Sequence, residues 1–167
     1  MNRLQAGFAR VNVTPMLGIG MAGYFIPRKA DGVLDELEMN ALALACGESK
    51  VVLISIDHCG IVKEVLNPMR QHVCDVTGLP WEAVYMHATH THTGPTLTAA
   101  LDDPLQKEYF DFVNQNTVFA LPLNELKDMS PDPTNFFKCF TGKSSYSVTT
   151  ESNKLSTDIM WYIINSL

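Results

Sequence analysis

Two segments decide the fold: residues 51–60, VVLISIDHCG, and residues 83–95, AVYMHATHTHTGP. Each starts as an apolar run and ends in polar residues and a glycine, which is typical of a buried strand that runs into a loop. Apolar residues between the two segments recur at steps of three and four, the period of a helix: Val62, Val65, Leu66, Met69, Val73 and Val76. Strand, helix and strand within about 40 residues make a βαβ unit with parallel strands. The sequence therefore predicts an α/β fold with a mixed or parallel sheet.

Three further elements follow from local patterns. Residues 8–13 alternate apolar and polar side chains and predict a first strand. The helix between the two segments is expected to begin or restart at Pro68, with Asn67 as its N-cap, and to end at Gly78. Residues 102–121 predict a second helix, with these side chains turned inward: Tyr109, Phe110, Val113 and Thr117.

The chain divides by composition into two parts. Residues 1–116 carry the strand and helix patterns and predict one α/β domain. Residues 117–167 differ, because the stretch 143–157 holds eight Ser or Thr residues in fifteen positions. We expect this second part to form edge strands or a poorly ordered extension.

Composition excludes several classes of protein. The chain has 167 residues, 12 Lys+Arg against 18 Asp+Glu and a net charge of −6, with 46% hydrophobic residues. That content supports a folded core, and the acidic balance argues against nucleic acid as a partner. No apolar run approaches the roughly 20 residues of a membrane span, and residues 1–12 lack the apolar core of a signal peptide. We therefore expect no transmembrane segment and a cytoplasmic protein.

The cysteines show neither metal-binding nor redox spacing. No C-x-x-C occurs among the four of them: Cys46, Cys59, Cys74 and Cys139. Without an export signal, the sequence predicts buried free thiols.

A glycine pattern at residues 18–23, GIGMAG, matches the dinucleotide fingerprint G-x-G-x-x-G, and Glu38 stands 20 residues after its first glycine. That fingerprint requires a helix to open from the loop. Pro27 follows too soon for a normal helix. We expect a tight loop that lies close to other backbone instead of a nucleotide site.

The principal candidate site is the pair His90 and His92 at the end of the second predicted strand. Side chains of an extended segment alternate faces, so both imidazoles are expected on one side, about 7 Å apart. They could share one zinc ion, or one could bind metal while the other contacts the substrate. The alternative is that both are ordinary surface or core histidines. His87 falls on the opposite face and is expected to be structural.

Asp57 ends the first predicted strand beside this pair. Its carboxylate is expected either to orient a metal-binding imidazole through the second ring nitrogen or to cap the following helix. A catalytic zinc ion normally has three protein ligands. Candidates for the third ligand are Asp57, His58 and an acidic residue such as Asp102 or Asp103.

Four ordered motifs together resemble a known family. They are residues 7–15, GFARVNVTP, residues 21–24, MAGY, the strand ending in Asp57, and residues 88–95, ATHTHTGP. In this order they resemble the N-terminal domain of the neutral/alkaline non-lysosomal ceramidase family, and the resemblance covers about residues 6–116. The match is closest to the shorter bacterial relatives.

The resemblance implies a zinc-dependent hydrolase that acts on a linear amide, with ceramide (N-acylsphingosine) as the family's type substrate and sphingolipid metabolism as its setting. It implies one zinc ion, His90 as a metal ligand and His92 in the active site near the substrate. Full-length ceramidases of this family are often secreted. The family's remaining zinc ligands come from downstream segments, whereas His92 is the last histidine here. The resemblance thus predicts an incomplete domain, inactive alone and prone to form homo-oligomers.

Two alternatives remain open from the sequence. The H-x-H pattern also occurs in amidohydrolase and PHP-type metallohydrolases, and that hypothesis predicts a barrel of alternating strands and helices. A non-enzymatic, degenerate fragment is the other alternative, and it predicts that no metal is bound.

Overall fold

The computed structural model describes residues 3–95, 97, 103–119, 123 and 127–128. All structural statements below concern these residues. Most of the predicted C-terminal part, including the Ser/Thr-rich stretch 143–157, lies outside them. The expectation of edge strands or an extension there, and the domain boundary near residue 116, therefore stay predictions.

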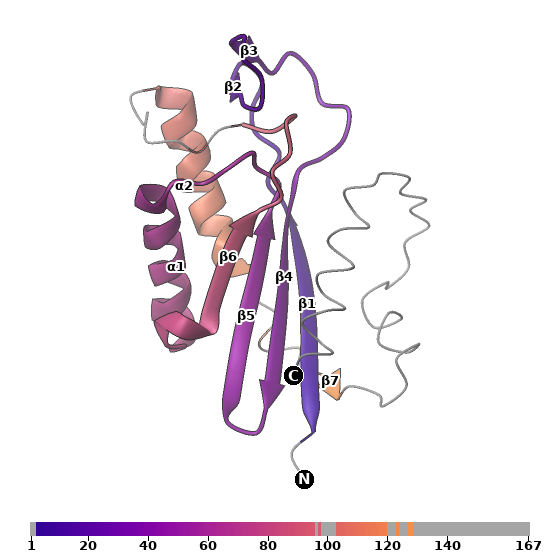
Figure 1. The fold of residues 1–167 in the computed structure, drawn as a ribbon, viewed down its shortest axis with the longest axis vertical. Coiled ribbons are helices and arrows are strands. Elements are labelled where there is room, and N and C mark those ends of the chain that lie inside the picture. Colours follow the sequence, from indigo (N-terminus) through magenta and orange to yellow (C-terminus); the bar gives the residue numbers. More distant parts are fainter. Residues whose placement is uncertain (1–2, 96, 98–102, 120–122, 124–126, 129–167) are drawn as a thin grey trace. The chain divides into compact units, whose positions relative to one another are not determined.

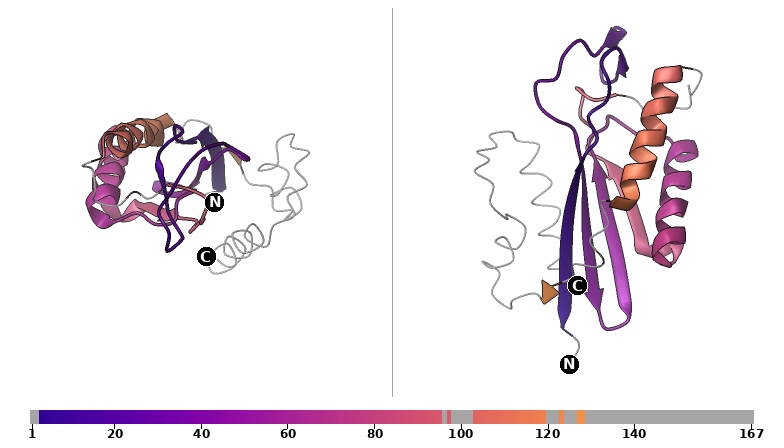
Figure 2. Two further views of the ribbon diagram at one scale, coloured as in Figure 1. Left: turned by 90° about the horizontal axis from the view of Figure 1, so that it is seen from above. Right: turned by 180° about the vertical axis from the view of Figure 1, so that it is seen from behind.

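The fold is α/β, as the sequence predicts, with a five-stranded mixed sheet. The strand order is β6 (Val84–Ala88), β5 (Ser49–Ile56), β4 (Glu38–Cys46), β1 (Leu4–Asn12) and β7 (Lys127–Asp128). Strands β5 and β6 run parallel, and all other neighbours in this sheet are antiparallel. Helices α1 (Lys63–Thr77) and α2 (Pro104–Phe119) cover the same face of the sheet (Figures 1 and 2).

Strand β5 lies between β6 and β4 in the sheet, and alternate side chains of this strand are buried. Val52, Ile54 and Ile56 belong to the core, together with apolar residues of β4 and α1. Parallel pairing joins Val52 to Val84 and Ile56 to Ala88. The two strands therefore end at the same edge of the sheet, which is the edge where an α/β sheet usually carries its site.

Helix α1 begins earlier than the sequence indicates. Its N-cap is Val62, without a side-chain capping bond, and Pro68 lies inside the helix. Proline cannot donate the hydrogen bond that an N–H at this position would give to the carbonyl four residues earlier. Burial of Val65 and Met69 on the sheet-facing side offsets that loss. The predicted end is confirmed, because Gly78 has φ 69° and donates its N–H to the Cys74 carbonyl at 2.8 Å.

Helix α2 has the buried face that its period predicts. Tyr109, Val113 and Thr117 are fully buried, and Phe110 is partly buried. The Tyr109 hydroxyl donates a hydrogen bond of 2.5 Å to the carbonyl of Val13. This bond joins α2 to the segment that follows β1.

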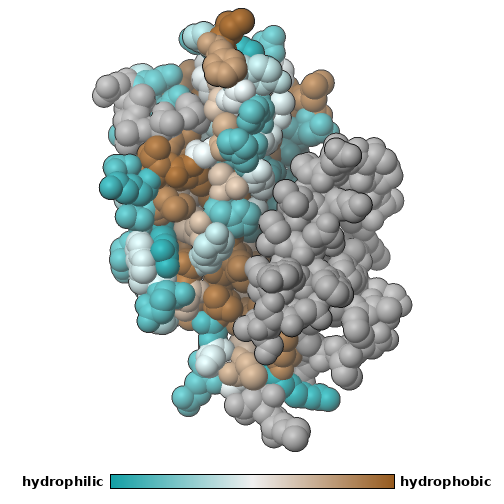
Figure 3. Space-filling view, viewed as in Figure 1, coloured by the Kyte–Doolittle hydropathy of each residue, from teal (hydrophilic) through white to brown (hydrophobic). Residues whose placement is uncertain are grey.

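The glycine-rich segment forms a small antiparallel ladder, β2 (Gly20–Met21) with β3 (Arg28–Lys29), and no helix opens from it. The predicted tight loop is confirmed, and the dinucleotide fingerprint is a coincidence of spacing. The Ala22 N–H donates to the Gly94 carbonyl at 2.9 Å, so the loop lies against the residues that follow β6. Figure 3 shows hydrophobic surface at the end that carries β2 and β3, where this apolar stretch is exposed: Tyr24, Phe25 and Ile26.

The barrel alternative disagrees with the strand pairing. A barrel of alternating strands and helices has parallel neighbours throughout, whereas β4 is antiparallel to both β5 and β1. A membrane span is also missing from the described helices, since none is long and apolar enough to cross a bilayer.

The cysteines differ from the expectation in their burial. The described cysteines Cys46, Cys59 and Cys74 are free thiols, as predicted. Only Cys74 is buried, whereas Cys46 is exposed and Cys59 is half-buried. Cys46 is the last residue of β4 and Cys59 lies in a loop, and neither belongs to the core cluster. Cys139 lies outside the described residues.

Candidate metal centre

The candidate site is built from the two loops that follow β5 and β6. Parallel pairing brings these loops together and continues beyond the strands: the Thr89 N–H donates to the Ile56 carbonyl, and the His90 N–H donates to the His58 carbonyl, both at 2.9 Å. The loop after β5 carries residues 57–60, and the loop after β6 carries both histidines of the H-x-H pattern.

The two histidines converge, but not by the predicted route. Strand β6 ends at Ala88, and His90 has φ 65°, so the pair does not lie on an extended strand. The left-handed backbone at His90 turns the chain instead. The imidazole centres of His90 and His92 lie 5.0 Å apart, and their Nε2 atoms are separated by 3.4 Å.

A backbone carbonyl sets the orientation of the His90 ring. The His90 Nδ1 lies 2.6 Å from the carbonyl oxygen of Cys59. A carbonyl oxygen only accepts hydrogen bonds, so Nδ1 carries the proton and Nε2 carries the lone pair. This tautomer is the one that metal-binding histidines adopt when their second nitrogen is held by a carbonyl. The lone pair of His90 thus faces His92.

The separation of the two nitrogens fits a zinc ion. Two nitrogens bound at about 2.0–2.1 Å to a tetrahedral zinc ion lie about 3.3–3.4 Å apart, and the observed separation is 3.4 Å. A candidate third donor is the thiol of Cys59, although its contact, at 3.9 Å, is with the protonated Nδ1 of His90 and not with Nε2. The donor atoms of Cys59, His90 and His92 all lie within 4.8 Å of one another. Imidazole nitrogen and thiolate sulfur are the donors found most often around zinc in proteins.

Cys59 is the residue that sequence reasoning missed. It was expected to be a buried thiol, and the third-ligand candidates were other residues. The sequence did hold a usable signal, because Cys59 follows β5 by three positions and parallel strands bring such loops to one edge.

Asp57 does not cap α1, and its role beside a metal-binding imidazole stays a prediction. Its Oδ1 accepts a hydrogen bond of 3.0 Å from the Thr89 hydroxyl, and its Oδ2 accepts one of 2.9 Å from the Glu38 N–H. Helix α1 is capped by Val62 instead. In the described structure the carboxylate therefore anchors the residue before His90.

His58 and Asp103, also predicted as third ligands, do not belong to the cluster of donor atoms among the described residues. His58 is fully buried with its ring 5.6 Å from that of Tyr109, and burial lowers its pKa to about 4. Neither of its ring nitrogens has a hydrogen-bond partner among the described residues. Burial, with a smaller effect of the Asp57 charge, raises the pKa of Tyr109. Asp103 accepts the Leu105 N–H at 3.0 Å and caps α2, while Asp102 lies outside the described residues.

The glycine-rich segment encloses His92 from the other side. A β-carbon on Gly23 would come within 2.4 Å of His92 Cγ, so only glycine allows this approach. The Tyr24 ring lies 6.1 Å from the His92 ring, in an edge arrangement. The Arg28 guanidinium stacks on Tyr24 at 3.6 Å and donates a hydrogen bond of 3.0 Å to the His92 carbonyl.

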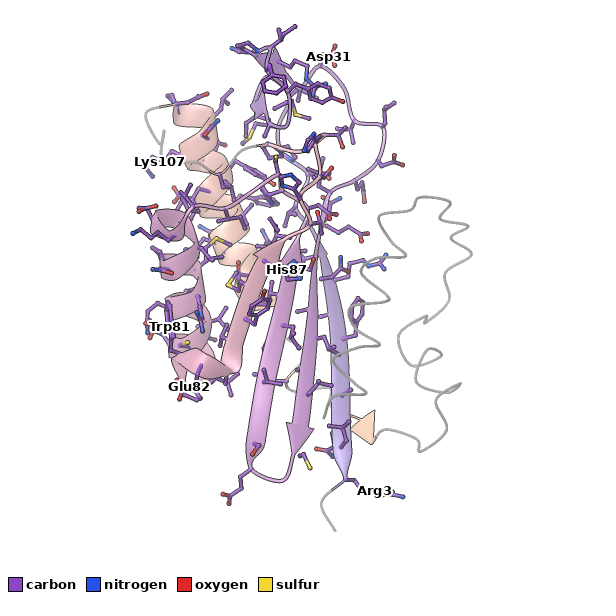
Figure 4. All side chains as sticks on the ribbon, viewed as in Figure 1. Arg3, Asp31, Trp81, Glu82, His87 and Lys107 are labelled. Atoms are coloured by element: carbon purple, nitrogen blue, oxygen red, sulfur yellow. The ribbon has the colours of Figure 1, made fainter. Side chains whose placement is uncertain are left out.

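His87 stays apart from this cluster. It lies on β6 before the loop begins (Figure 4). Its exposed ring is 5.8 Å from that of Tyr85, and it contributes no donor atom to the group formed by Cys59, His90 and His92. The structural role of His87 therefore stays a prediction.

Comparison with known proteins identifies the fold. No family model and no curated protein sequence matches the chain. The neutral ceramidase from Pseudomonas aeruginosa aligns with a TM-score of 0.66 and 20% sequence identity, over 77% of this chain and 22% of that chain. A ceramidase complexed with C2 aligns with a TM-score of 0.65 and 21% identity, again over 77% and 22%. The chain thus has a ceramidase-like fold and spans 22% of the length of these proteins.

Proposed function

We propose that this chain carries the metal centre of a zinc-dependent amide hydrolase of the ceramidase-like class. The observation that carries the proposal is the 3.4 Å separation of the His90 and His92 Nε2 atoms. A hydrogen bond from His92 Nε2–H to His90 Nε2 also has this length, but the thiol of Cys59 in the same cluster favours a shared divalent cation. The ceramidase-like fold supports the choice of reaction.

His90, His92 and Cys59 would hold one zinc ion. The Cys59 Sγ contacts Nδ1 and not Nε2 of His90, so its side chain would have to move for all three donors to bind one ion. Three protein ligands leave a fourth position open, as catalytic sites require. A zinc ion held by these residues would polarise an amide carbonyl and promote the ionisation of water near neutral pH.

The chain's own residues orient the donors. The Cys59 carbonyl holds the Nδ1 proton of His90, so the Nε2 lone pair is available without any proton loss. Gly23 and Arg28 fix the position of His92. The alternative role for His92 is proton transfer to the substrate, with His90 and Cys59 as the metal ligands.

The proposed substrate is a linear amide with a hydrocarbon chain, N-acylsphingosine or a related lipid amide. The structural neighbours are ceramidases. Tyr24 lies beside His92, and together with the next two residues, Phe25 and Ile26, it exposes apolar surface to which hydrocarbon binds. We propose a small-molecule or lipid amide, and no nucleic acid, as the partner of the site.

Metal analysis tests the proposal. Purified chain should hold one zinc ion, measured by elemental analysis, and His90→Ala should lose both the metal and any amidase activity. His87→Ala is the matched control, because His87 lies on β6 and contributes no atom to the cluster of Cys59, His90 and His92. His92→Ala separates the two roles of His92: a ligand loses metal, whereas a proton-transfer group keeps metal and loses activity. Metal-free protein at neutral pH, or metal retained by His90→Ala, would reject the proposal and favour a non-enzymatic domain.

A further inference from the structure

We propose that Arg28 forms a carboxylate-binding subsite next to the metal centre, so that the preferred amides carry an anionic group, as N-acyl amino acids do. This inference rests on the proposed function, because it selects among amide substrates of the same site. It goes beyond that function in naming the chemical group that the substrate presents.

Arg28 is held firmly although it is exposed. Its guanidinium lies 3.6 Å from the centre of the Tyr24 ring, which is the geometry of a cation–π contact. One of its terminal N–H groups donates to the His92 carbonyl at 3.0 Å. An arginine fixed by stacking loses less side-chain entropy on binding a ligand than a free one does.

The charge of Arg28 has no counterpart in the described structure. The ion pairs found there are Arg10–Glu38, Lys63–Glu64 and Lys107–Asp111. Apart from the bond to the His92 carbonyl, the guanidinium N–H groups of Arg28 have no hydrogen-bond partner among the described residues. A planar guanidinium with free N–H groups matches a carboxylate, which can accept two parallel hydrogen bonds.

The position of Arg28 next to His92 connects its charge to the candidate metal centre. Arg28 binds the backbone of His92 itself, and Tyr24 contacts both the guanidinium and the imidazole. A substrate whose amide reaches the two histidines is therefore near Tyr24, and a carboxylate close to that amide is within reach of Arg28. The exposed side chains of Phe25 and Ile26 offer contact to the acyl chain of the same molecule.

The reaction balances for such a substrate. Water adds to the amide carbonyl carbon, the C–N bond breaks, and the nitrogen takes a proton and leaves as the amine of the amino acid. The products are a fatty acid and an amino acid, and the carboxylate that Arg28 binds is unchanged throughout. Arg28 is therefore a specificity-determining residue and takes no part in proton transfer.

Binding is tested first, on metal-free protein, so that zinc cannot hold the carboxylate. NMR titration compares N-acetylglycine with N-acetylglycinamide, its neutral counterpart. We expect about fivefold tighter binding of the acid, as for a single exposed ion pair. Arg28→Gln should abolish the preference, Arg28→Lys should keep part of it, and the matched control Lys29→Gln should leave it unchanged. Equal binding of acid and amide, or equal loss in both glutamine variants, would overturn the proposal.

Catalysis is tested second, on the zinc-loaded chain. N-octanoylglycine and neutral N-octanoylethanolamine are compared by kcat/KM, and the ratio of the two values is the readout. A ratio that falls in Arg28→Gln through KM supports the subsite even if this variant is less stable. A ratio unaffected by Arg28→Gln rejects it while leaving the amide hydrolase in place. Arg28-dependent acid binding by a chain that takes up no zinc supports the subsite and rejects the proposed function.

Discussion

Gly23 lies so close to His92 that a β-carbon at Gly23 would come within 2.4 Å of the imidazole Cγ and 2.7 Å of the Cα. The same glycine has φ 89°, which side-chain-bearing residues rarely adopt. Two separate constraints thus require glycine at this position, and one of them, the close approach, is to a residue of the candidate metal centre. The glycine-rich segment therefore packs against the loop that carries His92 and does not form a nucleotide-binding loop.

Gly23→Ala should destabilise the chain by about 1–3 kcal/mol, from backbone strain together with displacement of His92. Zinc affinity should fall as well, since the two Nε2 atoms lose their spacing. Urea unfolding and a competitive zinc titration measure the two effects. Gly32→Ala is the control, because a β-carbon there meets nothing within 4 Å. Equal behaviour of the two variants would contradict the close approach.

Asp57→Ala should cost about 1.5–3 kcal/mol, because it removes a charged acceptor from the Glu38 N–H and the Thr89 hydroxyl. A double-mutant cycle with Thr89→Val should give a coupling of at least about 0.5 kcal/mol. The control is Thr91→Val, whose hydroxyl bonds to Thr93 and not to Asp57. Additive effects for Asp57 and Thr89 would show that the anchor is absent in solution.

Tyr109→Phe should destabilise the chain by about 1–3 kcal/mol, because the Val13 carbonyl loses the hydroxyl donor at 2.5 Å and stays buried. The raised pKa of Tyr109 means that the hydroxyl keeps its proton in the alkaline range where exposed tyrosines ionise. Thermal unfolding measures the loss. An unchanged melting temperature would argue that this bond does not join α2 to the segment after β1 in solution.

Stability should fall on acidification because of His58. Its folded pKa of about 4 lies below the unfolded value of 6.5, since burial disfavours the charged ring. Between these two values the unfolded chain binds the proton and the folded chain does not. The contribution of His58 is therefore complete above pH 6.5 and is lost toward pH 4, by up to about 3 kcal/mol.

Urea unfolding between pH 4 and pH 7, with EDTA present, measures this dependence. His58→Phe should flatten the profile in that window, whatever its effect on stability at neutral pH. His87→Gln is the matched control, since it removes an exposed histidine from the same region. A profile that keeps its slope in His58→Phe would assign the dependence to other groups.

The βαβ unit was predictable because its signals are local. Apolar runs and helical spacing within residues 51–95 fix two strands and a helix, and parallel strands end at one edge by necessity. The location of the candidate site followed from that rule. The start of α1 did not, since the apolar stripe of Val65 and Met69 outweighs the preference of Pro68 for a first turn.

The details of the metal centre could not be predicted, because they depend on contacts between distant segments. No local sequence pattern predicts that His90 takes φ 65° or that a backbone carbonyl holds its ring. Cys59 becomes a candidate donor only when the loop after β5 lies beside the loop after β6. Likewise, the Asp57 carboxylate meets the Glu38 N–H because β4 pairs with β5.

Helix α1 stands between the Cys59 thiol and the imidazoles of His90 and His92 in the sequence, although these donors lie within 4.8 Å in the fold. A denatured chain keeps the two histidines near each other but separates them from the thiol. Ion binding then draws its free energy from native strand pairing, so metal saturation should raise the melting temperature and chelators should lower it. Occupancy by zinc would in this way report whether β5 and β6 have paired correctly during folding.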